Sequence, residues 1–113
     1  MCSKTTLNEI TTKVVQAARK SLGNKLDKVI IYSSYARGDY HYESDIDIMI
    51  LANIQLEDRG EERSKIRSIL GHIDLEYDVV LSINVTDCYT FKKYASVYPF
   101  YIAVIKDGIE LSA

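Results

Sequence analysis

The sequence predicts a single α/β or α+β domain, in which a small mixed β-sheet has helices packed mainly on one face. Three observations lead to this fold class. The chain has 113 residues, enough for one modest hydrophobic core. Stretches with helical and with strand-like periodicity alternate along it, an order that produces sheets covered by helices. No internal repeat, low-complexity tract or linker divides it, so we expect one domain over residues 1–113.

The overall composition argues against several classes of protein. Apolar residues make up 47% of the chain and charged residues 27%, which is typical of a folded globular protein. The net charge of −2 gives no basic excess for a phosphate backbone, so direct nucleic-acid binding is disfavoured. No apolar run approaches the roughly 18 residues that a membrane span needs. Cys2 and Cys88 form no metal-binding spacing, and we expect a cytoplasmic protein with reduced thiols.

The first two elements are predicted to be a helix and a buried strand. Apolar residues recur at helical spacing, and Thr6 followed by Glu9 matches a capping box. This helix is expected to end near Leu22, where Gly23 can adopt a left-handed conformation. The apolar, β-branched residues 28–32 are typical of a buried strand.

A polar loop and a second strand are predicted next. Residues 33–44 are small, polar and aromatic, which indicates a loop. Residues 45–51 follow as a strand. Because side chains alternate between the two faces of a strand, Asp45 and Asp47 point to one face and three isoleucines point to the other. Two carboxylates therefore share one face of the predicted sheet.

A second long helix and a third strand are expected after this pair of acids. The charged stretch 56–70 ends in apolar residues, which indicates a helix with one buried side, although Gly60 weakens the pattern. The segment 73–85 alternates between apolar and more polar residues, which indicates a strand. Asp78 belongs to the more polar face of this strand.

The last part of the chain is predicted to contain two short helices and a terminal strand. Asp87 is expected to cap the first helix. Pro99 stands at a suitable position to open the second helix, which is expected to end at Gly108. Residues 109–111 can form the final strand.

Asp45, Asp47 and Asp78 are the candidate catalytic and metal-binding residues. Clustered carboxylates repel one another unless a cation neutralises them. Mg²⁺ prefers oxygen ligands and combines a few carboxylates with substrate phosphates, so acids on neighbouring strands can hold two such ions and a triphosphate. Other acids nearby are alternatives for the third position: Asp74, Glu76 and Asp87.

The loop before these acids contains the candidate nucleotide-binding residues Ser33, Ser34 and Arg37. The two serines follow the first strand, where backbone N–H groups and hydroxyls can bind phosphate oxygens. Arg37 can neutralise phosphate charge, or it can be a solvated side chain paired with Asp39. The tyrosines and the histidine of this loop are interpreted as locally packed and solvated residues.

The loop and the acids together resemble a known motif. Ten residues separate Ser34 from Asp45, the first acid of an Asp-x-Asp pair. This spacing is similar to the Gly-Ser, ten residues, Asp-x-Asp signature of the DNA polymerase beta-like nucleotidyltransferase superfamily. The segment around Asp78 resembles the strand that supplies the third carboxylate of that superfamily. Residues 97–109 resemble the C-terminal segment of its single-domain branch, the minimal nucleotidyltransferases (MNT).

The resemblance implies a nucleotidyltransferase fold and a Mg²⁺-dependent transfer of a nucleoside monophosphate from an NTP, expected to be ATP, to a hydroxyl group. It implies that Asp45 and Asp47 bind both metal ions, that Asp78 binds one and helps to activate the acceptor, and that Ser34 holds the triphosphate. Minimal members commonly act as antitoxins that adenylylate a helical HEPN-domain toxin. A partner protein is therefore the expected acceptor.

One position departs from the family pattern, because Ser33 stands where the family has glycine. A glycine lets the backbone approach a ligand closely, and a side chain limits that approach. The alternative function is a catalytically weak or inactive nucleotide-binding or antitoxin module that acts by binding its partner. Transfer to a small molecule is disfavoured, because the chain has no room for a second domain.

Overall fold

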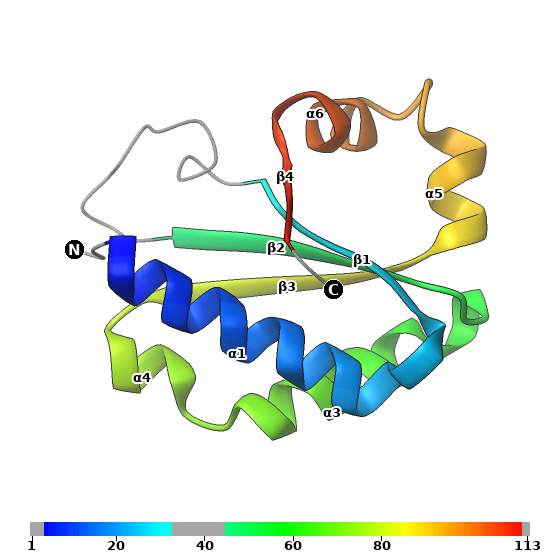
Figure 1. Cartoon of the computed structure of the whole chain (residues 1–113). Helices are drawn as coiled ribbons and strands as arrows, with labels where there is room; N and C mark the ends of the chain where they lie inside the picture. The colour runs from blue at the N-terminus through cyan, green and yellow to red at the C-terminus, as the bar shows by residue number, and fades with distance from the viewer. Residues whose placement is uncertain (1–3, 33–44, 112–113) are drawn as a thin grey trace.

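The computed structural model describes residues 4–32 and 45–111, which are arranged around one four-stranded β-sheet (Figure 1). No helix within these described residues is long and apolar enough to span a bilayer. In chain order the elements are α1 (Lys4–Leu22), η1 (Gly23–Lys25), β1 (Leu26–Ile31), β2 (Asp45–Ala52), η2 (Leu56–Asp58), α3 (Arg59–Leu70), α4 (Ile73–Tyr77), β3 (Val80–Asp87), α5 (Cys88–Tyr94), α6 (Pro99–Asp107) and β4 (Ile109–Leu111).

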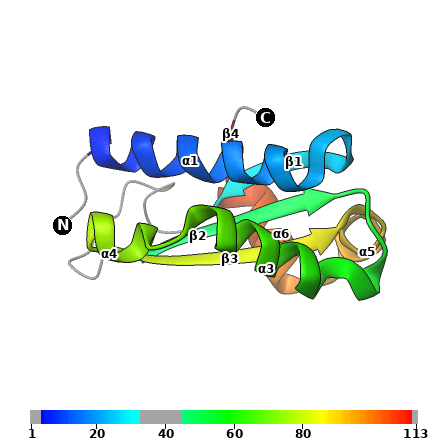
Figure 2. The same ribbon diagram turned by 90° about the horizontal axis from the view of Figure 1, so that it is seen from below.

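The sheet is mixed, with the strand order β3-β2-β1-β4. β1 pairs antiparallel with β2 and with β4, whereas β2 and β3 are parallel. A parallel pair needs a long crossover, which α3 and α4 provide. The two long helices α1 and α3 lie with α4 on one face, and the shorter α5 and α6 lie on the other (Figures 1 and 2). The predicted fold class, a mixed α+β sheet, is confirmed.

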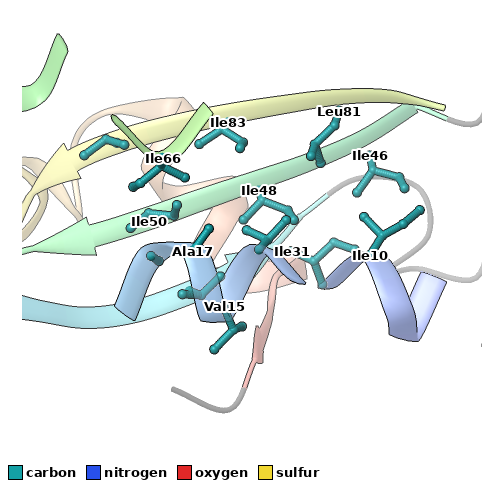
Figure 3. Close-up of a cluster of buried hydrophobic side chains, with 14 of the residues drawn as sticks. Ile10, Val15, Ala17, Ile31, Ile46, Ile48, Ile50, Ile66, Leu81 and Ile83 are labelled. Carbon is teal, nitrogen blue, oxygen red and sulfur yellow. The ribbon is translucent and has the colours of Figure 1, made fainter. Parts of the chain in front are cut away.

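The main core lies between the sheet and the helices α1 and α3. Alternate residues of β2 point into it, so Ile46, Ile48 and Ile50 are completely buried. Figure 3 shows these isoleucines beside Leu81 and Ile83 of the neighbouring strand. Burying each isoleucine side chain contributes about 1.5–3 kcal/mol, so this face largely determines which way β2 is turned. Buried residues of the long helices complete this core: Ile10, Val14, Val15, Ala17, Ala18 and Ile66.

A second, smaller core lies between the opposite face of the sheet and the helices α5 and α6. Met49 and Leu51 of β2 point into it, together with Phe91 of α5 and Val104 of α6. These side chains occupy the C-terminal half of β2. Asp47, on the same face in the N-terminal half of β2, is half-buried.

The segment before β3 differs from the prediction of a strand over 73–85. Residues 73–77 form the helix α4, and β3 begins at Val80. Ile73 and Tyr77, four residues apart, pack against the main core, whereas Leu75 is 81% exposed. That pattern has the period of a helix, and from Val80 onward the predicted alternation is confirmed.

The other predicted elements are confirmed with small shifts of their boundaries. The first helix begins at Lys4, before the Thr6 capping position, and ends at Leu22 as expected. Gly23 follows with a φ of 57°, the left-handed conformation that favours glycine. Asp87 caps α5 by accepting a hydrogen bond from the Thr90 amide at 2.9 Å. Pro99 stands at the start of α6.

Side chains from the crossover bond to the outer edge of β3. Arg63 Nε donates to the carbonyl oxygen of Ile83 at 2.8 Å, and Arg67 Nη2 donates to that of Leu81 at 2.8 Å. The Leu81 amide donates in turn to Asp74 Oδ2 at 3.0 Å. Backbone groups that would otherwise lack a partner strand are therefore bonded, and α3, α4 and β3 are held in fixed relation.

Gly108, between α6 and β4, provides a test of how closely the chain packs beside Ile30 of β1 and Val104 of α6. A Cβ atom there would lie 2.6 Å from Ile30 Cγ2 and even closer to the Val104 carbonyl oxygen. We expect Gly108→Ala to lower the free energy of unfolding by about 1–3 kcal/mol, because one of these groups must move. Gly60→Ala is the matched control, since a Cβ there meets nothing within 4 Å. Urea denaturation of both variants measures the difference, and equal effects would contradict this account.

Candidate active site

Asp45 and Asp47 begin the central strand β2 and occupy alternate positions on it. The buried isoleucines between and after them face the main core, so positions 45 and 47 belong to the opposite face, as predicted. The Asp47 side chain is half-buried. For Asp45 the structure describes the backbone only. Both aspartates therefore occupy the N-terminal end of β2, whereas α5 and α6 pack on Met49 and Leu51 nearer its C-terminal end.

The parallel pairing with β3 brings two further positions to this end of the sheet. Asp45 is in register with Val80, and Asp47 is in register with Ser82. Residues in register in a parallel pair point to the same face. Ser82 and Val80 are both exposed, so the surface beside the aspartates is open at β3. Ser82 is a further candidate residue of the active site. The sequence did not identify it, because strand register cannot be read from one sequence.

Tyr32, directly after β1, is a second neighbour of Asp47 that the sequence did not single out. Its amide donates to the Asp47 carbonyl oxygen at 3.0 Å. Its ring meets Phe100 edge to face, with a centroid distance of 5.4 Å. Burial raises the pKa of the Tyr32 phenol to about 12, and the Asp47 carboxylate adds to this shift. The phenol is therefore protonated at neutral pH and acts there as a hydrogen-bond donor or acceptor.

Asp78 lies in a different local structure from the one predicted. It follows α4 in the left-handed conformation, with φ 54° and ψ 53°, two residues before β3 begins. The predicted strand position is therefore wrong, although Asp78 remains exposed. Because Val80 is in register with Asp45, Asp78 lies at the same end of the sheet as the Asp-x-Asp pair. Aspartate tolerates this conformation better than most residues, and such outliers are common at functional sites.

Asp74, one of the alternatives for the third acid, has a structural role. Its carboxylate accepts hydrogen bonds from Arg67 at 3.0 and 3.4 Å and from the Leu81 amide at 3.0 Å. Burial alone would raise the pKa of Asp74, but these hydrogen bonds outweigh it and lower the pKa below its usual value. The ionised carboxylate of Asp74 therefore stabilises the turn that carries Asp78.

The other two alternatives also have partners in the fold. Glu76 forms an exposed ion pair with Lys13 at 3.3 Å. Asp87 is buried, caps α5 and lies 3.9 Å from Arg59. Asp87 is in register with Ala52, so it lies at the end of β2 opposite to the Asp-x-Asp pair. Their contacts favour Asp78 as the third acid.

The predicted nucleotide-binding residues Ser33, Ser34 and Arg37 lie outside the described residues. Among the side chains that are described, no group of three or more His, Cys, Asp and Glu residues is arranged to hold a metal ion. Asp47 and the Asp45 position, on one face of one strand, supply the carboxylate oxygens that Mg²⁺ prefers. The available donors therefore fit a magnesium ion better than a metal that prefers nitrogen or sulphur ligands.

Comparison with known proteins identifies the family of this chain. The chain belongs to the nucleotidyltransferase domain family, a family of group-transfer enzymes whose model matches residues 12–109. The predicted resemblance to minimal nucleotidyltransferases is thereby confirmed.

Two similar proteins come from Methanocaldococcus jannaschii, and each is named "Putative protein adenylyltransferase". One is 44% identical over 61 residues, which are 54% of this chain and 60% of the relative. The other is 30% identical over 94 residues, which are 83% of this chain and 86% of the relative. A solved toxin–antitoxin structure with AMP-PNP is also similar, with a TM-score of 0.54 and 25% identity, and the match covers 90% of this chain and 72% of that chain.

The role of Asp74 can be tested through the pH dependence of stability. A carboxyl group whose pKa is lowered by folding stabilises the native state at neutral pH, and this contribution is lost as the pH falls through the folded pKa. We expect Asp74→Asn to lower the free energy of unfolding by about 1–2 kcal/mol at pH 7 and by less in acid. The measurement is urea denaturation between pH 7 and pH 3. Glu76→Gln, which alters only an exposed pair, is the control and should change stability by less than about 0.5 kcal/mol.

Proposed function

We propose that this protein transfers AMP from ATP to a hydroxyl group of a partner protein, in a reaction that requires two Mg²⁺ ions. The observation that carries this proposal is the position of Asp45 and Asp47. They share one face at the start of β2, an inner strand of a nucleotidyltransferase domain, and Val80 and Ser82 in register with them on β3 are exposed. A triphosphate needs such an open, acid-lined surface to bind together with its metal ions.

The proposed chemistry is an in-line displacement at the α-phosphorus atom. The acceptor oxygen forms a bond to this phosphorus while the bond to pyrophosphate breaks, and pyrophosphate leaves with the bonding electrons. When bound, magnesium ions neutralise the phosphate charge and make the acceptor hydroxyl more acidic. Asp45 and Asp47 would hold both ions, and Asp78 would hold one and accept the proton of the hydroxyl. Ser33, Ser34 and Arg37 bind the phosphate groups.

Two further observations support a protein as acceptor. The relatives from Methanocaldococcus jannaschii are named for protein adenylylation, and a toxin–antitoxin complex with AMP-PNP has a similar fold. We infer that the partner is a helical HEPN-type toxin in the cytoplasm and that this chain is its antitoxin.

The second candidate function is a module that binds nucleotide or its partner without chemistry. Ser33 favours this alternative, because it replaces the glycine of the family pattern. In that case formation of the complex with the partner protein would not depend on the carboxylates of β2.

Asp47→Asn tests the catalytic proposal. We expect the substitution to reduce transfer of labelled AMP by about 100-fold or more, because a metal ligand stabilises the transition state by several kcal/mol. Mg²⁺ with ATP should raise the melting temperature of the parent protein and raise that of the variant less. Asp78→Asn should also reduce transfer without unfolding the protein, since asparagine tolerates the left-handed conformation.

Asp58→Asn is the matched control, because Asp58 is exposed and its side chain makes no capping hydrogen bond. It should retain transfer. Full activity of Asp47→Asn would refute the proposed role of this carboxylate, and an unaltered complex with the partner would support the non-catalytic alternative.

Ser33→Gly tests whether the departure from the family pattern weakens the site. Backbone N–H groups must come within about 2.9 Å of phosphate oxygens, and a side chain at this turn limits that approach. We therefore expect the glycine variant to bind ATP more tightly or transfer AMP faster. Calorimetric titration and label transfer should be compared at a temperature where both proteins are folded, since glycine can cost up to about 1 kcal/mol of stability. Weaker ATP binding by a folded variant would show that the Ser33 side chain itself binds the nucleotide.

A further inference from the structure

The helices α5 and α6 lie together on one face of the sheet (Figure 1). Several large apolar residues of these helices and of the segment between them are exposed. We call this region the α5–α6 surface and define it by its exposed residues Tyr89, Tyr94, Val97, Tyr98, Ile102 and Ile105. Within it lies a groove of about 430 Å³, lined by Tyr94, Val97, Tyr98, Pro99 and Tyr101. Val97 is 68% exposed and Tyr98 is 50% exposed, which is unusual for apolar residues clustered on one surface.

The floor of this groove is well packed. Tyr101 is 7% exposed, and its ring contacts Phe91 at 4.9 Å and Tyr98 at 4.8 Å between centroids. A preformed floor lowers the entropy cost of binding, and tyrosines are enriched at the centres of protein interfaces. The groove is therefore suited to receive apolar side chains of another molecule.

The segment that forms the α5–α6 surface has a positive formal charge in an acidic chain. Residues 88–107 contain three lysines and one aspartate, a formal charge of +2. The whole chain has a charge of −2, so the remaining residues carry −4. The Lys93 ammonium lies over the rings of Tyr89 and Tyr94, at 5.7 and 5.5 Å from their centroids. The Lys93 cation thus lies beside Tyr94, one of the residues that line the groove, and an acidic ligand is electrostatically complementary to it.

A series of aromatic contacts connects the groove with the candidate active site. Tyr98 contacts Phe100 at 6.2 Å between ring centroids, and Phe100 contacts Tyr32 at 5.4 Å. The Tyr32 amide bonds to the Asp47 backbone at 3.0 Å. The groove itself lies toward the C-terminal end of β3, where Tyr101 is beside Thr86 and Asp87, so a molecule seated in it must extend along this face to reach Asp47.

We propose that the α5–α6 surface docks an acidic, amphipathic helix of the protein that this enzyme modifies, an inference that rests on the proposed function. Apolar side chains at helical spacing fill the groove, and flanking carboxylates pair with Lys92 and Lys93. A second copy of this chain fits less well, because a two-fold contact would bring the lysines of both copies together. Nucleic acid also fits less well, since the aliphatic residues Val97, Ile102 and Ile105 offer it no partner.

A pair of synthetic peptides tests this proposal. The first is a helix with leucines at positions i, i+3, i+4 and i+7, flanked by glutamates, and the second has lysines in place of the glutamates. We expect the parent protein to bind the acidic peptide in fluorescence anisotropy. The double variant Lys92→Glu/Lys93→Glu should bind it about 10-fold more weakly or worse and should gain affinity for the basic peptide. Lys20→Glu/Lys25→Glu, with the same change of charge on exposed residues of α1 and η1, is the matched control and should behave as the parent.

Several outcomes would overturn the proposal. The acidic peptide could fail to bind, or both double variants could lose its binding equally. The protein could dimerise through this surface, seen as concentration dependence in sedimentation. A single-stranded RNA could bind more tightly than the acidic peptide and lose its binding in the Lys92→Glu/Lys93→Glu variant. Asp47→Asn separates this proposal from the proposed function. Retained peptide binding with transfer lost in that variant supports both, whereas peptide binding without any transfer by the parent protein supports docking alone.

Discussion

The parallel pairing of β2 with β3 is the constraint on which the rest of the structure depends. It extends over all eight residues of each strand, from Asp45 opposite Val80 to Ala52 opposite Asp87. Parallel strands require a crossover, so α3 and α4 must cover one face, and the buried isoleucines of β2 must point toward them. The aspartates at alternate positions are consequently turned to the opposite face. The same hydrophobic burial that stabilises the fold thereby assigns positions 45 and 47 to the face opposite the main core.

The sequence predicted most of this fold because its periodic segments are long. The alternating isoleucines of β2 and the apolar stripe of α1 each allow only one orientation toward a core. The prediction for residues 73–77 was wrong because the spacing of Ile73 and Tyr77 fits both a strand and a helix. Residues four apart lie on the same face of a strand and also on the same face of a helix. The contact that distinguishes the two cases is tertiary, since Asp74 must meet Arg67 and the Leu81 amide for α4 to form where it does. No local pattern contains that information.

The candidate site was predictable to a similar degree. The shared face of Asp45 and Asp47 follows from strand geometry alone, and the spacing to Ser34 identified the family. The neighbours of Asp47 were not predictable. Ser82 lies beside Asp47 because of the register of β2 and β3, and Tyr32 bonds to the Asp47 backbone because β1 pairs antiparallel with β2. For Asp78 the sequence supplied the residue but not its conformation, since the α4 turn depends on the contacts of Asp74.

The bonds from Arg63 and Arg67 to the carbonyl oxygens of Ile83 and Leu81 have a consequence for how this protein behaves in a crowded solution. An uncovered outer strand can recruit a strand from a neighbouring molecule, and repeated addition leads to fibrils. At β3 two of the acceptors that such a strand would use are already bonded to guanidinium groups. Replacing either arginine would therefore free one of these acceptors for pairing with another strand.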